Sequence, residues 1–152
     1  MDPHSQVTTD AGGAKVRDVV AASNALGLVA VLGDCGAVGM AVLTMGGGYG
    51  PLNGKYGLAA DNLLGAEMVL ADGRRVATGP DEEPELYWAI RGSGGNFGVV
   101  TSTGIQMPEK RHMLAGSIVY SWSEAERVLR RYAAFAATMP DEFAGADTGV
   151  RP

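Results

Sequence analysis

Apolar residues recur at helical spacing in three segments of the chain, and each segment predicts an amphipathic helix. The expected helices span residues 15–26, 84–92 and 123–138. Gly27 follows the first of them and suits a helix stop, because glycine readily takes the left-handed conformation that ends a helix. Ser123 and Glu126 have the spacing of a capping box, which predicts the start of the third helix.

Short apolar runs and alternating patterns predict five strands. They span residues 28–32, 63–71, 75–78, 99–106 and 116–122. Asp72 and Gly73 separate the second and third strands and predict a tight antiparallel hairpin. Residues 33–50 are rich in glycine and leave little room for a regular helix. Helices mixed with an antiparallel hairpin predict an α+β fold.

Composition excludes several classes of protein. The chain has 152 residues, 46% hydrophobic and 19% charged, which is the balance of one globular domain. A net charge of −5 and the lack of a basic stripe argue against a nucleic-acid partner. No apolar run approaches the roughly 18 residues of a membrane span. The first residues lack the regions of a signal peptide, so a cytoplasmic location is expected.

Cysteine and histidine are too scarce for a metal site. Cys35 is the single cysteine, which excludes an intramolecular disulfide and a cysteine-based zinc cluster. His4 and His112 lie far apart and have no metal-ligand spacing. We therefore expect no metal.

Three glycine-dense stretches follow one another, at residues 46–50, 55–62 and 91–101. Glycine lets a backbone approach another group closely, so they predict a flat or charged ligand lying against bare main chain. A dinucleotide fingerprint needs glycines at i, i+2 and i+5, and every candidate fails at the last position. A P-loop fails because Tyr49 and Tyr56 stand at required positions, and no serine lies in a nucleophile elbow.

The whole order of motifs resembles the flavin-binding domain of the berberine bridge enzyme-like FAD-linked oxidases, within the vanillyl-alcohol oxidase superfamily. Members share Gly-x-Cys-x-x-Val-Gly, Gly-Gly-Gly-Tyr/Ile-Gly, Arg/Lys-Tyr-Gly-Leu, Asp-Asn, Leu-Phe/Tyr-Trp-Ala-Leu/Ile-Arg-Gly and Gly-Gly-Asn-Phe-Gly-Val-Val-Thr. This chain carries them at residues 33–39, 46–50, 55–58, 61–62, 86–92 and 94–101. The resemblance covers residues 7 to about 122, and the combination makes it specific.

The resemblance implies the fold, the boundaries and the cofactor. It implies an α+β unit like the second subdomain of a PCMH-type FAD-binding domain, followed by the first strand and helix of the substrate domain. Residues 1–106 would be the C-terminal part of the FAD-binding domain, and residues 107–152 the start of a truncated substrate domain. Main-chain amides would serve the flavin oxygens and pyrophosphate. The implied cofactor-binding residues are Cys35, Val38, Gly39, Gly46, Gly47, Gly48, Tyr49, Gly50, Asn96, Phe97, Gly98 and Val99.

Cys35 aligns with a cysteine that some members join to the flavin as a thioether. Two interpretations stay open: a flavin-linking or flavin-facing thiol, and a small buried core residue, which is the usual fate of a free cysteine. The family's histidyl link is absent from this chain. Val42 also departs from the family, which usually has glycine there, because a β-branched residue resists positive φ.

The resemblance implies part of a FAD-linked oxidoreductase that oxidises a small organic substrate by hydride transfer to flavin, with O2 as acceptor. No catalytic base is evident, since Glu67 and Asp72 are expected on a solvated hairpin, so the chain alone is expected to be inactive. One alternative is a non-catalytic remnant that acts as an assembly or partner-binding module, as a homodimer or with a complementing N-terminal fragment. Another is a non-flavin small-ligand binder.

Overall fold

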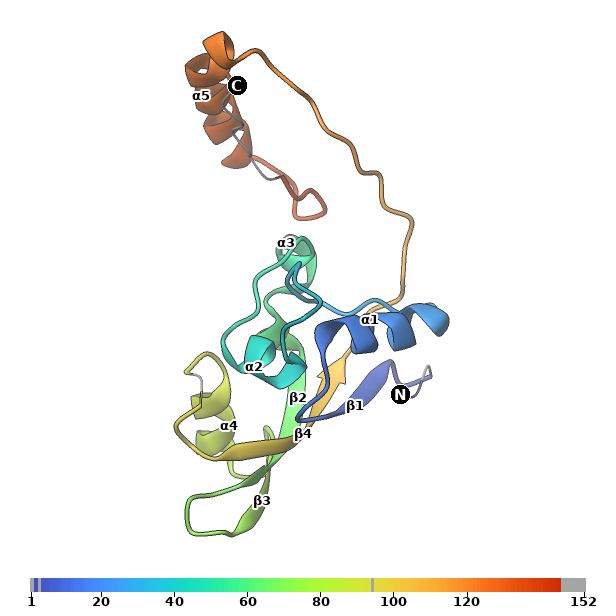
Figure 1. Cartoon of the computed structure of the whole chain (residues 1–152), viewed down its shortest axis with the longest axis vertical. Helices are drawn as coiled ribbons and strands as arrows, with labels where there is room; N and C mark the ends of the chain where they lie inside the picture. The colour runs from blue at the N-terminus through green and yellow to red at the C-terminus, as the bar shows by residue number, and fades with distance from the viewer. Residues whose placement is uncertain (1, 3, 94, 146–152) are drawn as a thin grey trace.

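A four-stranded antiparallel sheet forms the body of the molecule (Figure 1). The structure is a computed structural model and describes residues 2, 4–93 and 95–145. The strands are β1 (Val7–Ala11), β2 (Leu63–Val69), β3 (Arg75–Thr78) and β4 (Val99–Gln106), in the order β1-β4-β2-β3. The last strand in sequence therefore lies between the first two, and it joins the start of the chain to the hairpin.

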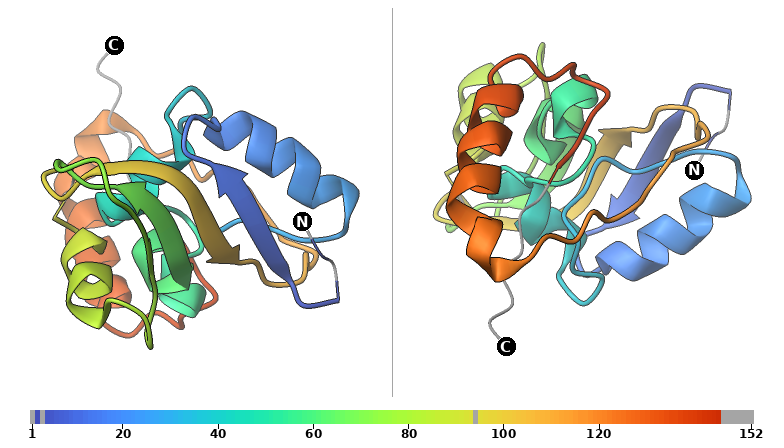
Figure 2. Two further views of the ribbon diagram at one scale, coloured as in Figure 1. Left: turned by 90° about the horizontal axis from the view of Figure 1, so that it is seen from below. Right: turned by 90° about the horizontal axis from the view of Figure 1, so that it is seen from above.

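Helices cover one face of this sheet. The helices of the chain are α1 (Val16–Ala25), α2 (Met40–Met45), α3 (Asn53–Tyr56), α4 (Pro84–Ile90) and α5 (Ala125–Ala136), with 3₁₀ turns η1 (Ala59–Asn62) and η2 (Trp122–Glu124), and α5 and η2 lie away from the sheet. Figure 2 shows α1 and α2 behind the sheet on the same side. Residues of the opposite face, such as Thr9, Glu67 and Thr101, are exposed, as is common for antiparallel sheets.

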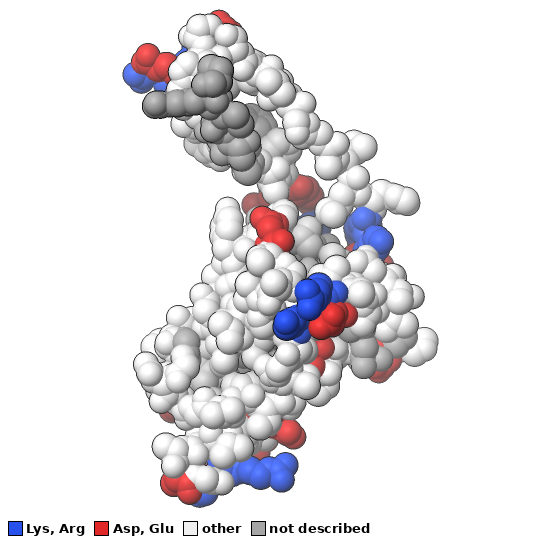
Figure 3. All heavy atoms as spheres, viewed as in Figure 1, with Lys and Arg blue, Asp and Glu red and all other residues white. Residues whose placement is uncertain are grey.

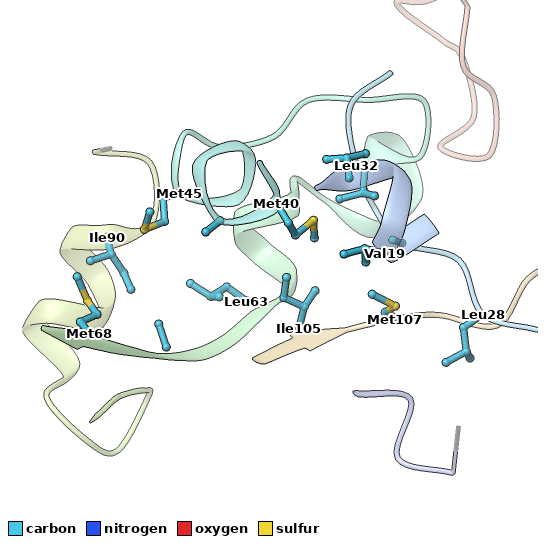
Figure 4. Close-up of a cluster of buried hydrophobic side chains, with 14 residues drawn as sticks. Val19, Leu28, Leu32, Met40, Met45, Leu63, Met68, Ile90, Ile105 and Met107 are labelled. Atoms are coloured by element: carbon cyan, nitrogen blue, oxygen red, sulfur yellow. The ribbon is translucent and has the colours of Figure 1, made fainter. Parts of the chain in front are cut away.

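The core lies between α1, α2, α4 and the covered face of β2 and β4. Figure 4 shows its side chains as one continuous row. Met40, Leu63, Ile105 and Met107 are each at most 1% exposed. Met107 follows β4, so the chain keeps packing against the body beyond the sheet. The amide of Lys110 donates a hydrogen bond to the carbonyl of Gly27 at 2.8 Å.

The structure confirms the predicted helices near residues 15–26, 84–92 and 123–138 and the hairpin at residues 63–78. Its mixed helices and antiparallel sheet confirm the α+β class. Gly27 ends α1 with φ +70°, as expected. The β1 strand was not predicted, because Thr8 and Asp10 place polar side chains on its buried face.

Three predictions are wrong. Residues 28–32 are buried but make only one isolated bridge, from Leu28 to Glu109, so they form no strand. Residues 33–50 do contain a helix, α2, whose sequence between Gly39 and Gly46 is free of glycine. Residues 116–122 are exposed and extended up to η2, because no other strand lies beside them.

The C-terminal region stands apart from the body in Figure 1. An extended segment leads from the body to η2 and α5, and the chain then returns toward α3. The ammonium Nζ of Lys55 lies 3.3 Å from Oε1 of Glu142, which ties this return to the body. Charged side chains are scattered in small groups over the face in Figure 3. Among the residues that the structure describes, no helix has the length and apolar character needed to cross a membrane.

Candidate functional site

Two of the glycine-dense stretches meet at the C-terminal end of α2. The amide of Gly92 donates a hydrogen bond to the carbonyl of Met45 at 2.8 Å. Gly92 has φ +108°, a conformation that other residues rarely adopt. This contact places Gly92 beside the run that begins at Gly46. Gly94 lies outside the described residues.

Packing within the chain explains some of the glycines. A Cβ on Gly48 would lie 2.4 Å from Cβ of Ala59, and one on Gly50 would lie 1.7 Å from the carbonyl oxygen of Leu32. A Cβ on Gly98 would lie 2.6 Å from the carbonyl oxygen of Val69. These positions need glycine whether or not a ligand is bound.

Packing does not explain Gly39, which precedes α2. A Cβ there would meet nothing closer than Cγ2 of Val42, at 3.9 Å, and the backbone has an ordinary φ of −68°. Gly46 is exposed, although a Cβ there would lie 3.2 Å from the carbonyl oxygen of Val42, and Gly47 has φ +104° with no contact closer than 4.0 Å. Bare backbone at Gly39, Gly46 and Gly47 therefore forms a surface around α2, which we call the glycine surface.

Unpaired main-chain amides lie beside the glycine surface. The carbonyls of Gly47 and Gly48 accept hydrogen bonds from Ala60 and Ala59, at 2.9 and 3.0 Å. The amides of Gly48 and Tyr49, in contrast, have no hydrogen-bond partner within the described part of the chain. An amide without a partner is a ready donor for a ligand oxygen.

Cys35 lies in the loop that leads to α2 and is exposed. The loop is held against the start of α1, because the amide of Arg17 donates to the carbonyl of Gly36 at 3.0 Å and that of Val16 to Val38 at 2.9 Å. The interpretation of Cys35 as a buried core residue is wrong. Its exposed thiol is on a fixed loop next to the N-terminal side of α2.

Two exposed side chains, those of Val42 and Tyr49, belong to residues beside the glycines of this surface. Val42 is 68% exposed and Tyr49 is 83% exposed. Val42 has a helical conformation within α2, so the strain expected from a β-branched residue at positive φ does not arise. In the glycine-dense stretch at residues 91–101, Asn96, Phe97 and Val99 are also exposed.

Arg91 holds this region together, although the sequence motifs gave it no separate role. Its Nε donates to the carbonyl of Ala60 at 3.0 Å, and its guanidinium lies 5.1 Å from the centre of the Tyr87 ring. The hydroxyl of Tyr87 donates to the carbonyl of Leu63. These contacts fix α4 against η1, and so fix Gly92 against α2. Trp88 is on the outer side of α4 and is 77% exposed.

Charged groups do not converge on the glycine surface. Asp10 is buried in the sheet, where burial raises its pKa above the ordinary value. Asp72 is on the hairpin, and its hydrogen bond from Arg74 lowers its pKa. The described residues contain no group of three metal-ligating side chains. The glycine surface is therefore made of main chain, with the thiol of Cys35 in the loop that leads to it.

Comparison with known proteins identifies the family of this chain. The sequence profile of the FAD binding domain matches residues 1–79, just over half of the chain. The chain belongs to the FAD-binding domain family. The resemblance seen in the motifs is confirmed, and FAD is the cofactor of this family of oxidases and oxidoreductases.

Two proteins similar to this chain are oxidases. (R)-6-hydroxynicotine oxidase of Paenarthrobacter nicotinovorans is 47% identical over 116 residues, which are 76% of this chain and 25% of that protein. The crystal structure of 6-hydroxy-D-nicotine oxidase from Arthrobacter nicotinovorans has a TM-score of 0.85 at 41% identity, covering 92% of this chain and 32% of that one. This chain thus spans about a quarter to a third of the length of these two relatives.

A third similar protein has a flavin that is linked to a cysteine. Glucooligosaccharide oxidase from Acremonium strictum, whose structure is described with a 6-S-cysteinyl, 8α-N1-histidyl FAD, has a TM-score of 0.67 at 34% identity. The match covers 69% of this chain and 22% of that one. A cysteinyl flavin link therefore occurs among proteins similar to this FAD-binding domain.

The residues present fit FAD on structural grounds. Gly39 leaves open space that a Cβ would fill, and the amides of Gly48 and Tyr49 remain free to donate. A flat ring with carbonyl oxygens, joined to a pyrophosphate, suits such a surface better than a cationic ligand would. Two cavities of the described chain lie elsewhere, one beside α5 and one beside α3.

Proposed function

We propose that this chain forms the glycine-rich side of the FAD site in an FAD-dependent oxidoreductase of the oxidase type. FAD, when bound, supplies the acceptor for a hydride from a small organic substrate and passes the electrons to O2. The observation that carries the proposal is the pairing of Gly39, a glycine that packing does not require, with the unpartnered amides of Gly48 and Tyr49.

The residues of the chain bind and orient the cofactor. The amides of Gly48 and Tyr49 donate to flavin or pyrophosphate oxygens, as main-chain donors do in other anion sites. Gly39, Gly46 and Gly47 let the ring lie close to the backbone. Val38 flanks this surface from the loop before α2, and the exposed Asn96, Phe97 and Val99 close it from the neighbouring segment. Gly50 and Gly98 serve by packing the two segments tightly.

Cys35 is the proposed thiol that faces the flavin ring, and a thioether between its Sγ and the ring is the stronger form of this hypothesis. The chain is loaded with FAD, acid-precipitated and digested, and the peptide masses are recorded. A flavin adduct on the Cys35 peptide, absent from Cys35→Ser, supports the thioether. Flavin that leaves entirely with the supernatant refutes the thioether but keeps reversible binding.

The chain alone is proposed to turn over no substrate, because it offers no base at the glycine surface. Glu67 and Asp72 are both exposed on the hairpin, and the lowered pKa of Asp72 makes it a weaker base than an ordinary aspartate. The substrate is expected to be defined by residues after about Met107, which fits the proposed boundary between residues 1–106 and 107–152.

The test of the proposal is flavin retention. The purified chain is incubated with FAD, passed through a desalting column, and its absorbance spectrum recorded. A flavin band that elutes with the protein supports an FAD site. Protein that is folded by circular dichroism and elutes without flavin, at any FAD concentration, contradicts it.

A further inference from the structure

The turn η1 holds two consecutive carbonyls at the glycine surface. The amide of Ala60 donates to the carbonyl of Gly47 at 2.9 Å, and the amide of Ala59 donates to the carbonyl of Gly48 at 3.0 Å. Ala59 and Ala60 are 1% and 5% exposed, so these two bonds are shielded from water. The peptide planes that follow Gly47 and Gly48 are therefore fixed against the body of the molecule.

The same two bonds set the direction of the unpaired amides. Every peptide bond of the described residues is trans. In a planar trans peptide, the carbonyl and the N–H of one plane point in opposite directions. The carbonyl of Gly47 points toward η1, so the amide of Gly48 points away from this buried turn. The carbonyl of Gly48 orients the amide of Tyr49 in the same way, which leaves two adjacent donors facing away from η1.

The side chain of Arg91 holds η1 itself. Its Nε donates to the carbonyl of Ala60 at 3.0 Å, and its Nη2 donates to Oδ1 of Asp61 at 3.4 Å. The other oxygen of Asp61, Oδ2, accepts from the amide of Leu58 at 2.8 Å, which closes the turn. One planar guanidinium thus bonds both a carbonyl of η1 and the carboxylate that caps it. A lysine ammonium does not reproduce this pair of directed donors.

The residues on either side of Arg91 fasten α4 to the same region. Ile90, the last residue of α4, is 1% exposed and belongs to the row of core side chains in Figure 4. Gly92 donates its amide to the carbonyl of Met45, directly before the glycine run. Residues 90–92 therefore hold the glycine run at its start through Gly92 and further along through η1.

The contacts of Arg91 differ from those of the other paired arginines. Arg91 bonds groups that are 30 and 31 positions away in sequence, and one of them is a main-chain carbonyl. The other arginine ion pairs of the described residues join partners at most four positions apart. These pairs are Arg17–Asp18, Arg74–Asp72, Arg127–Glu124 and Arg130–Glu126. Such exposed local pairs fix little, whereas Arg91 links two distant segments.

We propose that Arg91 is a positioning residue of the FAD site. Through η1 it fixes the peptide planes after Gly47 and Gly48, and so it directs the amides of Gly48 and Tyr49 at the ligand before FAD binds. Donors that are already ordered lose less freedom on binding, which raises affinity. The inference rests on the proposed function, because it assigns Arg91 a role at the same FAD site.

Hydrogen exchange tests the hold on the turn without any ligand. Arg91→Met keeps a long apolar stem beside Tyr87 and removes the N–H donors. The amides of Ala59 and Ala60 are expected to exchange about tenfold faster than in wild type, because their acceptors are no longer held in place. The amide of Gly12 donates to the carbonyl of Thr101 at 2.8 Å in the sheet and serves as the internal control. No acceleration at Ala59 and Ala60, or equal acceleration at all three amides, overturns the proposal.

Titration with FAD tests the consequence for the site. Arg91→Met is expected to bind FAD about tenfold more weakly than wild type, which corresponds to the loss of one hydrogen bond to a ligand. Arg74→Met is the matched control, because Arg74 is on the hairpin and pairs only with Asp72 among the described residues. It is expected to bind FAD like wild type. Circular dichroism checks that both variants are folded.

Arg91→Lys separates direction from charge. A positive charge near the site would attract anionic FAD without positioning any amide, and lysine keeps this charge. Since a lysine ammonium does not reproduce the directed pair of donors, Arg91→Lys is expected to bind FAD more weakly than wild type and more tightly than Arg91→Met. Affinity of Arg91→Lys equal to that of wild type would assign the effect to charge and overturn the positioning role.

The failure of this inference is distinguishable from failure of the proposed function. If wild type binds FAD and folded Arg91→Met binds it equally well, Arg91 does not position the site and the proposed function stands. If folded wild type binds no FAD, the proposed function is contradicted and the positioning role falls with it.

Discussion

The amide of Gly92 donates to the carbonyl of Met45 at 2.8 Å, and this hydrogen bond joins two motifs that lie almost fifty positions apart in sequence. Gly92 can do so because its φ is +108°, and because Arg91 and Tyr87 hold α4 against η1. The contact places Gly92, near the start of the third glycine-dense stretch, at the edge of the glycine surface.

Replacing Gly92 is expected to destabilise this contact. Gly92→Ala meets no atom within 4 Å, so its cost is backbone strain alone, about 1–2 kcal/mol in the free energy of unfolding. Urea denaturation measures the cost. Gly95→Ala is the matched control, because Gly95 is in the same loop without a left-handed φ, and it also has open space around it. Equal stability of both variants would contradict the assigned conformation.

Gly48 is expected to tolerate a side chain less well than a glycine that has positive φ but open space around it. In Gly48→Ala, φ of +75° combines with contacts of 2.4 Å to Ala59 and 2.7 Å to Leu43. Overpacking adds about 1–3 kcal/mol to the strain. Gly27→Ala, with φ of +70° and open space, isolates the strain. Thermal unfolding of the two variants should differ, and a larger loss for Gly27→Ala would refute the close approach.

Asp10 is expected to lower stability at neutral pH. Burial raises the pKa of its carboxyl in the folded state, partly offset by the hydrogen bond from Thr8 at 2.9 Å. The folded chain therefore holds the proton more tightly than the unfolded chain. Ionisation then costs stability as pH rises from the ordinary aspartate pKa, about 3.9, through the raised folded value.

The variant Asp10→Asn removes this ionisation and keeps an oxygen for Thr8. Its stability relative to wild type is expected to be unchanged below the ordinary aspartate pKa, to grow as pH rises through the window, and then to level off. Urea denaturation at several pH values measures the difference in the free energy of unfolding between the variant and wild type. The other carboxylates titrate alike in both proteins, so their contributions cancel in this difference. Parallel stability curves at every pH would contradict the account.

Much of the fold follows from periodicity in the sequence. The hairpin of β2 and β3 and the helices α1, α4 and α5 were predictable because their apolar residues have one clear period. β1 was not, because Thr8 and Asp10 disguise its buried face, and residues 28–32 were misread because burial alone does not make a strand. In both cases, hydrogen bonding to a distant segment of the chain determines whether the residues form a strand.

The candidate site, like the fold, could be predicted from the sequence only in part. The motif order identified the glycine stretches, but not which glycines serve packing. Gly48, Gly50 and Gly98 have steric reasons that only the folded chain reveals. Arg91 was part of a motif, yet its bond to the carbonyl of Ala60 depends on a turn thirty positions away.

Val42 is expected to weaken flavin binding by holding the ring off the backbone. Its Cγ2 stands 3.9 Å from the Cβ position of Gly39, and the side chain is 68% exposed. Val42→Gly should therefore bind FAD more tightly than wild type, with Val42→Ala between them. The helix loses about 0.5–1 kcal/mol relative to alanine in the glycine variant, which circular dichroism monitors. Equal or weaker binding by both folded variants would contradict this role.

The central claim is tested most directly by titrating three forms of the chain with FAD and monitoring flavin fluorescence. The three forms are wild type, Gly39→Asn and Gly13→Asn. Asparagine is a good N-cap, so Gly39→Asn keeps α2 while it fills the space over the backbone. Gly13 is exposed with nothing within 4 Å, which makes it the control. The account predicts saturable binding by wild type and Gly13→Asn, and at least tenfold weaker binding by Gly39→Asn. Equal binding by all three, or none by wild type, would contradict an FAD site at the glycine surface.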